Sequence, residues 1–418
     1  MAEPTYRAPK GTRDLLAPAS TRFRSLVATF AELAAGAGFG EIVPPMFEDI
    51  GVFQRIGEAT DVVTKEMYSF ETKGGDRFAL RPEQTASIVR AFVEHRPDTP
   101  WKAWYAGPNF RYERPQAGRY RQFDQVGVEV LGTDDAAADV EVIALGWRFY
   151  EAVGLRRVTL KLNSLGTPED LAGYVAALHA YLTANSGALS AQGRATLERN
   201  PLRVLDSKRP EDAEVIAASP LITEHLSAAA AAHFDKVMAG LSSLGIAYTL
   251  APHLVRGLDY YTRTTFEYAA DALETSQDAV GGGGRYDGLA EALGGPPTPG
   301  IGFALGVDRV LLACDAEGVF PPPRRAVDVF VVDVVDGTNA TVIVDALRRA
   351  GLRADRAFDR RSMKSQMKRA DASGAALAVI IGEQEVAEGT VVVRDLRTSE
   401  QESVARDEMI ERVRKLTG

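Results

Sequence analysis

The stretch from Phe110 to Val130 constrains the fold of this 418-residue chain more than any other segment. Apolar and polar residues alternate on either side of a basic loop, which predicts two antiparallel strands joined by that loop. Arg111, Gln125 and Glu129 fall on the strands, and the last two, four residues apart, face the same side. The loop carries Arg114, Gln116, Arg119 and Arg121. This pattern indicates a functional polar face on a sheet, with a plain hairpin bearing exposed charge as the alternative.

A second segment, from Leu254 to Tyr268, places an arginine, an aspartate and two adjacent tyrosines before an alternating run that predicts a strand. Gly257 permits a turn directly after Arg256. Tyr260 and Tyr261 are expected to point to opposite sides of the chain. A fixed cation beside phenolic groups suits an anionic intermediate and a small polar ligand. By itself, the segment is also compatible with an ordinary hairpin.

Two glycine-rich runs do not match the common nucleotide-binding loops. Gly281 to Gly288 lacks the GxxxxGK[ST] pattern, and Gly300 to Gly306 misses the GxGxxG spacing. If the protein binds a nucleotide, arginines must grip its phosphates, because their planar forks bind phosphate bidentately and stay charged. The second run leads from a strand into a helix that presents Arg309.

The pattern of apolar residues changes twice along the chain. Residues 166–246 are alanine-rich and predict a helical insertion in a β-rich domain. After Pro321-Pro322-Pro323, a plausible stiff linker, β-branched runs alternate with helices. We therefore expect an α+β protein with one domain over 1–325, including the insertion, and an α/β domain over 326–418.

Shorter elements are also predicted within the first domain. Helical spacing of apolar residues predicts a helix over 20–35, and residues 67–82 predict a hairpin with a turn at Lys73 to Asp76. The Pro44-Pro45 pair cannot lie in a central ladder and is placed at a sheet edge or an interface.

Composition excludes several classes of site. A single cysteine, Cys314, excludes an internal disulfide framework, and five scattered histidines lack metal-binding spacing, so no metal site by Cys or His ligation is expected. No apolar run approaches a membrane span, and we expect a cytoplasmic protein without membrane partners. The net charge of −9 argues against a non-specific nucleic-acid coater, although Asp345 to Ala370 holds nine basic and three acidic residues, a local charge of +6.

Taken together, these motifs resemble those of class II aminoacyl-tRNA synthetases. The Pro44-Pro45 segment, the strand–loop–strand from Phe110 and the Gly302-to-Arg309 transition resemble class motifs 1, 2 and 3. Arg256-Gly-Leu-Asp-Tyr-Tyr and Leu80-Arg-Pro-Glu-Gln-Thr85 resemble the signature of the histidyl-tRNA synthetase family. The segments from Pro9 to Asp14 and from Asn200 to Lys208 resemble its bacterial type. The resemblance covers essentially the whole chain.

The resemblance implies a histidine–tRNA ligase that uses ATP with Mg²⁺ to form histidyl-adenylate and then charges tRNA(His). It implies a class II antiparallel catalytic sheet of six or seven strands and a homodimer formed through motif 1. It also implies that the insertion approaches the acceptor arm and that the C-terminal domain binds the anticodon. The alternative is a non-catalytic, histidine-sensing paralogue such as the regulatory subunit of ATP phosphoribosyltransferase.

The resemblance also implies a role for individual residues. The catalytic set would be Arg111, Gln125, Arg256 and Arg309. ATP would be bound by Arg111, Glu113 and Arg309, and the acceptor end of the tRNA by Arg114, Gln116 and Arg119. Histidine would be bound by Glu83, Gln84, Thr85, Arg111, Gln125, Glu129, Arg256, Tyr260 and Tyr261. Within this set Glu129 and Tyr261 would bracket the imidazole, because an acceptor and a donor together read its two nitrogens.

Overall fold

The computed structural model describes residues 6–55, 62–255, 259–273, 278–323, 327–358 and 361–417. Backbone contacts divide the chain into two compact units, Met1–Pro321 and Pro322–Gly418. Each unit has hydrophobic cores of its own. The two units are therefore described separately.

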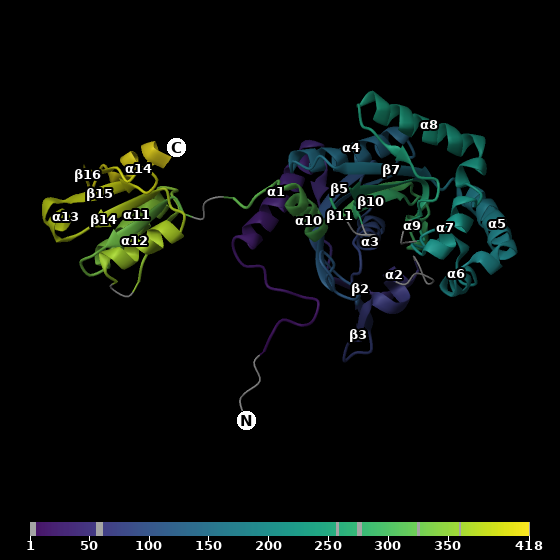
Figure 1. Cartoon of the computed structure of the whole chain (residues 1–418), viewed down its shortest axis with the longest axis horizontal. Helices are drawn as coiled ribbons and strands as arrows, with labels where there is room; N and C mark the ends of the chain where they lie inside the picture. The colour runs from purple at the N-terminus through teal and green to yellow at the C-terminus, as the bar shows by residue number, and fades with distance from the viewer. Residues whose placement is uncertain are drawn as a thin grey trace. The chain divides into compact units, whose positions relative to one another are not determined.

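An eight-stranded sheet, in the order β1-β5-β6-β11-β10-β9-β7-β8, forms the centre of the first unit (Figure 1). Its strands are β1 (Gly40–Glu41), β5 (Trp101–Phe110), β6 (Gln122–Leu131), β7 (Val158–Ser164), β8 (Thr249–Leu250), β9 (Thr262–Ala270), β10 (Ala279–Arg285) and β11 (Gly300–Gly306). The pairs are antiparallel except at the two ends, where β1 and β8 pair in parallel with β5 and β7. The six strands from β5 to β7 in this order are antiparallel, as the resemblance implies for the catalytic sheet, and the two-residue strands β1 and β8 extend that sheet at its edges.

Four helices cover one face of this sheet. They are α1 (Ala19–Gly36), α4 (Ala136–Ala152), α8 (Ala228–Ser243) and α10 (Val307–Glu317). Figure 1 shows α4 and α8 on the side of the sheet away from α3 (Thr85–His95). Val126, Val128 and Val130 of β6 face the core beneath these helices, and since side chains alternate, Gln125 and Glu129 face the other way. The alternation thus separates a packed face from a polar face.

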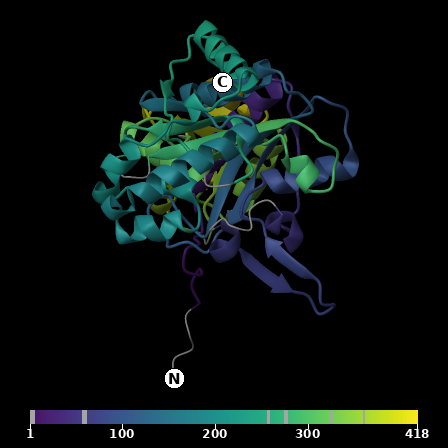
Figure 2. The same cartoon turned by 90° about the vertical axis from the view of Figure 1, so that its right-hand side faces the viewer.

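The other face carries α3 and a small three-stranded sheet, in the order β2-β4-β3. Its strands are β2 (Phe47–Asp49), β3 (Tyr68–Glu71) and β4 (Arg77–Leu80), flanked by α2 (Ile50–Gln54), the π-helix η1 (Val62–Glu66) and α9 (Leu289–Ala292). The hairpin expected over 67–82 is confirmed, and in Figure 2 it projects away from the central sheet. The Pro44-Pro45 pair lies outside any ladder, between the edge strands β1 and β2.

The alanine-rich region forms helices, as the sequence predicts. It contains α5 (Pro168–Ala184), α6 (Ala191–Leu197) and α7 (Pro210–Ala217), with short 3-10 turns at Ser186–Ala188, Pro201–Val204 and Ile222–Glu224. A capping box between Thr167 and Asp170 fixes the start of α5. These helices share a core of their own, built around Tyr174, Leu178 and Leu182.

The second unit is a five-stranded sheet with helices on both faces, in the order β13-β12-β14-β15-β16. Its elements are β12 (Val329–Asp333), α11 (Thr338–Arg349), β13 (Ala354–Arg356), α12 (Met363–Ala372), β14 (Leu377–Ile381), α13 (Glu383–Glu388), β15 (Thr390–Asp395), β16 (Gln401–Ala405) and α14 (Met409–Thr417). Val329 and Val331 pack towards α11 and α14, whereas Phe330 and Val332 pack towards α12. This explains the uninterrupted apolar run of β12, because both of its faces are buried.

No single helix in the described ranges is long and apolar enough to cross a membrane, although the bent pair Pro210–Glu224 and Ala228–Ser243 passes the same test of length and composition together.

Candidate active site

Two cavities meet on the polar face of the central sheet. The larger one has a volume of about 690 Å³ and the smaller one about 180 Å³. Arg111, Gln125, Gly282 and Ala304 line both cavities. A small ligand in one cavity and a larger ligand in the other would therefore touch at Arg111 and Gln125.

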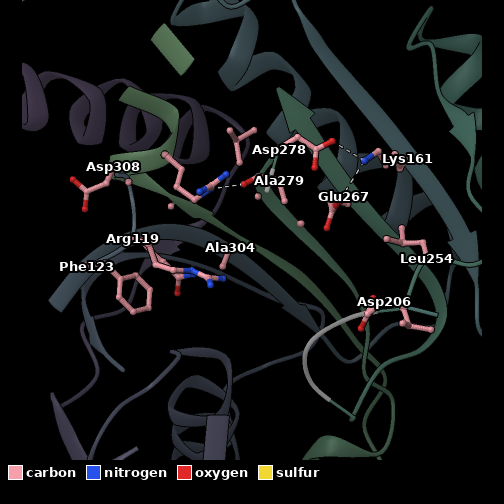
Figure 3. A pocket seen from close by; sticks show the side chains of 18 of the residues that line it. Arg119, Phe123, Lys161, Asp206, Leu254, Glu267, Asp278, Ala279, Ala304 and Asp308 are labelled. Atoms are coloured by element: carbon pink, nitrogen blue, oxygen red, sulfur yellow. Dashed lines mark hydrogen bonds and ion pairs between the residues drawn. The ribbon is translucent and has the colours of Figure 1, made fainter. Parts of the chain in front are cut away.

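Charged side chains of both signs line the larger cavity. In Figure 3, Lys161 lies between Asp278 and Glu267, with its ammonium nitrogen 3.0 Å and 3.7 Å from their carboxylates. Arg119, Phe123 and Asp308 lie towards one end, and Leu254 and Asp206 lie towards the other (Figure 3). The insertion contributes Asp206 and Lys208 to the lining, so the cavity is completed by two parts of the chain far apart in sequence.

The two arginines expected to bind phosphate both reach this cavity. Arg111 directly follows β5, donates from Nε to the carbonyl of Pro82 at 2.9 Å, and lies 5.4 Å from the centre of the Phe123 ring. Arg309, in the first turn of α10, donates from Nε to the carbonyl of Ala279 at 2.5 Å. Burial lowers the pKa of Arg309, and the nearby positive charge of Arg119 lowers it further. The structure thus gathers three arginines around one space, an arrangement that attracts anions.

The loop residues divide into two groups. Arg119 lines the larger cavity and forms an ion pair with Glu113 at 2.8 Å, and Glu113 also lines the cavity. Arg114 and Gln116 are exposed on the loop and lie outside the lining of either cavity. The structure therefore brings Arg119 to the site and leaves the other two at the surface.

Glu129 is fully buried directly behind Gly302, which lines the smaller cavity, and is not itself among the lining residues of either cavity. Its carboxylate accepts hydrogen bonds from the hydroxyls of Thr85 at 2.8 Å and Tyr286 at 2.5 Å. Burial raises the pKa of Glu129 to about 8, against the hydrogen bonds from Tyr286 and Thr85, which lower it. Burial thus disfavours the ionised form of Glu129 relative to an exposed carboxylate.

The segment from Arg81 to Thr85 is held by buried hydrogen bonds. The carboxylate of Glu83 accepts from the backbone N–H groups of Thr85 and Ala86 at 2.7 and 2.9 Å, and so caps α3. Gln84 donates to the carbonyl of Gly107 at 3.2 Å, while its own Oε1 is buried and has no hydrogen-bond partner among the residues that the structure describes. Burial raises the pKa of Glu83 as well. Glu83, Gln84 and Thr85 all line the smaller cavity.

The two adjacent tyrosines do not point to opposite sides. Their ring centres are only 4.7 Å apart, and the ring of Tyr260 also contacts that of Tyr286 at 6.0 Å. The expectation was wrong because β9 begins only at Thr262, so both tyrosines lie in the turn before it and strand alternation does not apply. All three rings line the smaller cavity.

Arg256, the residue expected to stabilise charge at the α-phosphate, lies outside the described residues, as does Gly257. The flanking residues Leu254 and Val255 line the larger cavity. The role of Arg256 thus stays a prediction from the sequence.

Several lining residues were not assigned a role from the sequence. They are Tyr105, Phe123, Lys161, His253, Glu267, Asp278 and Tyr286. Tyr286 follows the run Gly281 to Gly284, and that run was the available signal, since glycines in a strand mark a close approach of backbones. Asn109 was missed too; it donates to Oε1 of Gln125 at 2.7 Å and so fixes the orientation of that amide.

Comparisons with known proteins cover the whole chain. Residues 11–310 match the family model described as Histidyl-tRNA synthetase, and residues 328–416 match the one described as Anticodon binding domain. The chain is 48% identical over 415 residues to the histidine–tRNA ligase of Rhodococcus erythropolis, which covers 98% of this chain and 97% of that protein. The crystal structure of apo histidyl-tRNA synthetase from S. aureus is similar with a TM-score of 0.82 and 35% identity, covering 98% and 100% of the two chains.

Proposed function

Because the chain belongs to the histidyl-tRNA synthetase family and is a histidine–tRNA ligase, we propose how its residues share the two steps of that reaction. In the first step, a carboxylate oxygen of histidine attacks the α-phosphorus of ATP, and the bond to the leaving pyrophosphate breaks. In the second step, the 3′-terminal hydroxyl of tRNA(His) takes the histidyl group and AMP leaves. The observation that carries the proposal is that a small and a large cavity meet at Arg111 and Gln125.

Histidine occupies the smaller cavity in this proposal. Glu83, Thr85 and Gln125 hold its α-amino and carboxylate groups, and Gln84 lines the same cavity. Glu129 and Tyr261 read the two imidazole nitrogens, with Tyr260 beside them. An analogue without those nitrogens would leave buried polar groups unpaired, at a cost of about 1–3 kcal/mol for each group.

ATP occupies the larger cavity. Arg111 and Arg309 bind its phosphates, Glu113 lies near the adenine, and Arg256 stabilises the charge that develops at the α-phosphate. The catalytic contribution is mainly positioning and electrostatic stabilisation, which hold the carboxylate in line with the phosphorus. No side chain in this set has to form a covalent bond with the substrate.

Mg²⁺ would enter with ATP. Among the described residues no group of three or more His, Cys, Asp or Glu side chains can hold a metal ion, so a site built from protein ligands alone does not fit. Glu267 and Asp278, which pair with Lys161 at the wall of the larger cavity, would be the carboxylates to hold an ion that takes most of its ligands from phosphate and water. When bound, Mg²⁺ would supply positive charge to the phosphates.

The remaining assignments concern partners. Arg114, Gln116 and Arg119 meet the acceptor end of the tRNA, and the second unit meets the anticodon. The net positive charge of the segment from Asp345 to Ala370 supports contact of the second unit with the anticodon. Ion pairs of Arg349 with Asp345 and of Arg353 with Asp328 neutralise part of that charge.

We assign the protein to the cytoplasm as a homodimer formed through the Pro44-Pro45 segment.

The regulatory alternative is not supported. Similarity to a structure titled as an ATP phosphoribosyltransferase regulatory subunit/histidyl-tRNA synthetase from Bacillus halodurans, at 22% identity and a TM-score of 0.62, shows a shared fold only. This chain has Arg111 and Arg309 in one cavity and carries the anticodon-binding unit.

The site assignment is tested by histidine-dependent ATP–pyrophosphate exchange. Arg256→Ala should lower the exchange rate by about 10²-fold or more, since it removes a charge that binds the transition state. Arg148→Ala, at an exposed position on α4, serves as the matched control and should keep the wild-type rate. An Arg256→Ala protein that exchanges at the wild-type rate would remove Arg256 from the site.

A further inference from the structure

The N-terminal segment from Pro9 to Arg13, here called the strap, contacts both chain segments that carry the phosphate-binding arginines. One contact is with the end of the loop at residues 111–121, and the other is with the first turn of α10. The strap belongs to no helix or strand. None of its residues has a role in the reaction as proposed.

The first contact reaches Arg111 through two backbone hydrogen bonds. The N–H of Arg121 donates to the carbonyl of Gly11 at 2.8 Å, and the N–H of Arg111 donates to the carbonyl of Arg121 at 2.9 Å. Gly11 has a φ of +87°, and a β-carbon there would lie 2.6 Å from Cγ of Arg121. Only glycine therefore fits at this point of the strap without moving Arg121.

The second contact is made by the side chain of Arg13. Its guanidinium pairs with the carboxylate of Asp308, the residue next to Arg309, and stacks on the ring of Tyr120 with 4.0 Å to the ring centre. Asp308 is only 9% exposed, and both Asp308 and Tyr120 line the larger cavity. Arg13 thus contacts both Tyr120, near the end of the loop, and Asp308, at the start of α10. Arg13 and Asp308 are 295 residues apart in the sequence.

A contact that holds the loop against α10 has to act against electrostatic repulsion, because Arg111 and Arg119 of the loop line the same cavity as Arg309 of α10. Arg119 lies close enough to Arg309 for its charge to lower the pKa of Arg309. Repulsion between these two partly buried cations works against holding the loop beside α10, although Arg119 also pairs with Glu113. The ion pair of Arg13 with Asp308 and its stacking on Tyr120 offset that repulsion. Neither contact uses an arginine that is assigned to the phosphates.

We propose that Arg13 is a positioning residue for ATP, which fixes the loop at 111–121 against the first turn of α10. It thereby sets the separation of Arg111 and Arg309. The inference rests on the proposed assignment of those two arginines to the phosphates. Arg13 itself touches neither substrate in this proposal.

The test is the kinetics of ATP–pyrophosphate exchange with the full-length chain. Arg13→Ala should raise the KM for ATP about five- to tenfold and leave the KM for histidine within twofold, because a displacement near 1 Å is enough to cost this much. Arg13→Lys keeps the charge but loses the planar stack, and should give an intermediate KM for ATP. Arg7→Ala, at an exposed position two residues before the strap, is the matched control.

The outcomes separate the inference from the function. A KM for ATP within twofold of wild type in Arg13→Ala overturns the inference, as does an equal rise in both KM values or a lower Tm without a change in the KM for ATP. If Arg13→Ala does not fold, an unchanged KM for ATP in Arg13→Lys overturns it in the same way. Wild-type protein that shows no histidine-dependent exchange contradicts the proposed function itself, whatever Arg13 does.

Discussion

The buried carboxyl group of Glu129 is expected to make histidine binding depend on pH. Its carboxyl is fully buried, contacts Thr85 and Tyr286, and lies behind Gly302, a residue that lines the smaller cavity. Burial outweighs the two hydrogen bonds and raises its pKa to about 8 from an ordinary value of 4.5. An imidazole N–H donor would favour the ionised form, so ligand binding and deprotonation of Glu129 are expected to be coupled.

We predict that stability falls with rising pH because of this group. A folded-state pKa above the unfolded one means that the stabilising contribution is fully present below pH 4.5 and is lost as the pH rises through about 8. Between pH 6 and pH 9 the free energy of unfolding should therefore fall by about 3 kcal/mol more in wild type than in Glu129→Gln, which cannot ionise. Urea unfolding at several pH values measures this difference.

The control for this prediction is Glu94→Gln, at an exposed position near the end of α3. It should keep the pH dependence of the wild-type protein. If Glu129→Gln and wild type show parallel curves over the same range, the carboxyl of Glu129 is not the group responsible.

At the scale of elements, the glycines of β10 and β11 decide how closely the sheet packs at the site. A β-carbon on Gly283 would lie 1.9 Å from the carbonyl oxygen of Gly302, and one on Gly302 would lie 1.6 Å from Oε2 of Glu129. The run Gly281 to Gly284 is therefore a strand that needs the absence of side chains, not a phosphate-binding loop. The same glycines keep the floor of both cavities open.

Gly302→Ala should consequently destabilise the first unit and disturb the smaller cavity. Overpacking of this kind costs about 1–3 kcal/mol, and here the added atom meets a buried carboxylate that has little room to move. Gly36→Ala, at the end of α1 where a β-carbon meets nothing within 4 Å, should be nearly neutral. Chemical unfolding of both variants provides the measurement, and equal stability of the two would contradict the packing argument.

At the scale of the whole molecule, the chain divides into two units with separate cores. The second unit buries apolar side chains on both faces of its sheet, around Val331 and Leu347 on one side and Phe330 and Ala378 on the other. These cores are built only from residues of that unit. Two complete cores on one sheet are sufficient for a domain of this size to fold independently.

We predict that residues 322–418, produced alone, fold cooperatively, and that residues 1–321 alone keep histidine-dependent pyrophosphate exchange. The reason is that both cavities are lined only by residues of the first unit. Transfer of histidine to tRNA(His) should be weakened in the shorter chain, because it lacks the anticodon-binding unit. Thermal unfolding of the fragment and the two activities of residues 1–321 test this, and loss of exchange on truncation would contradict it.

The sequence alone predicted the features that depend on neighbouring residues. Alternation over Phe123 to Leu131 predicted β6, apolar spacing over 20–35 predicted α1, and the apolar runs after Pro323 predicted β12, β14 and β15 of the second unit. Motif resemblance identified the family, and the structure brings Arg111, Gln125 and Arg309 to the same site. The short strands β1, β8, β13 and β16 were not anticipated, because a few polar or exposed residues carry no clear period.

Tertiary structure decided which distant residues meet. The sequence gives no sign that Tyr286 bonds Glu129 across 157 positions, or that Arg13 pairs with Asp308 across 295. It also placed Tyr260 and Tyr261 on opposite sides, whereas a turn brings their rings together. Local patterns fix the period of each element because they act between near neighbours, but contacts between elements, and the raised pKa of Glu129 that follows from burial, exist only once the chain is packed.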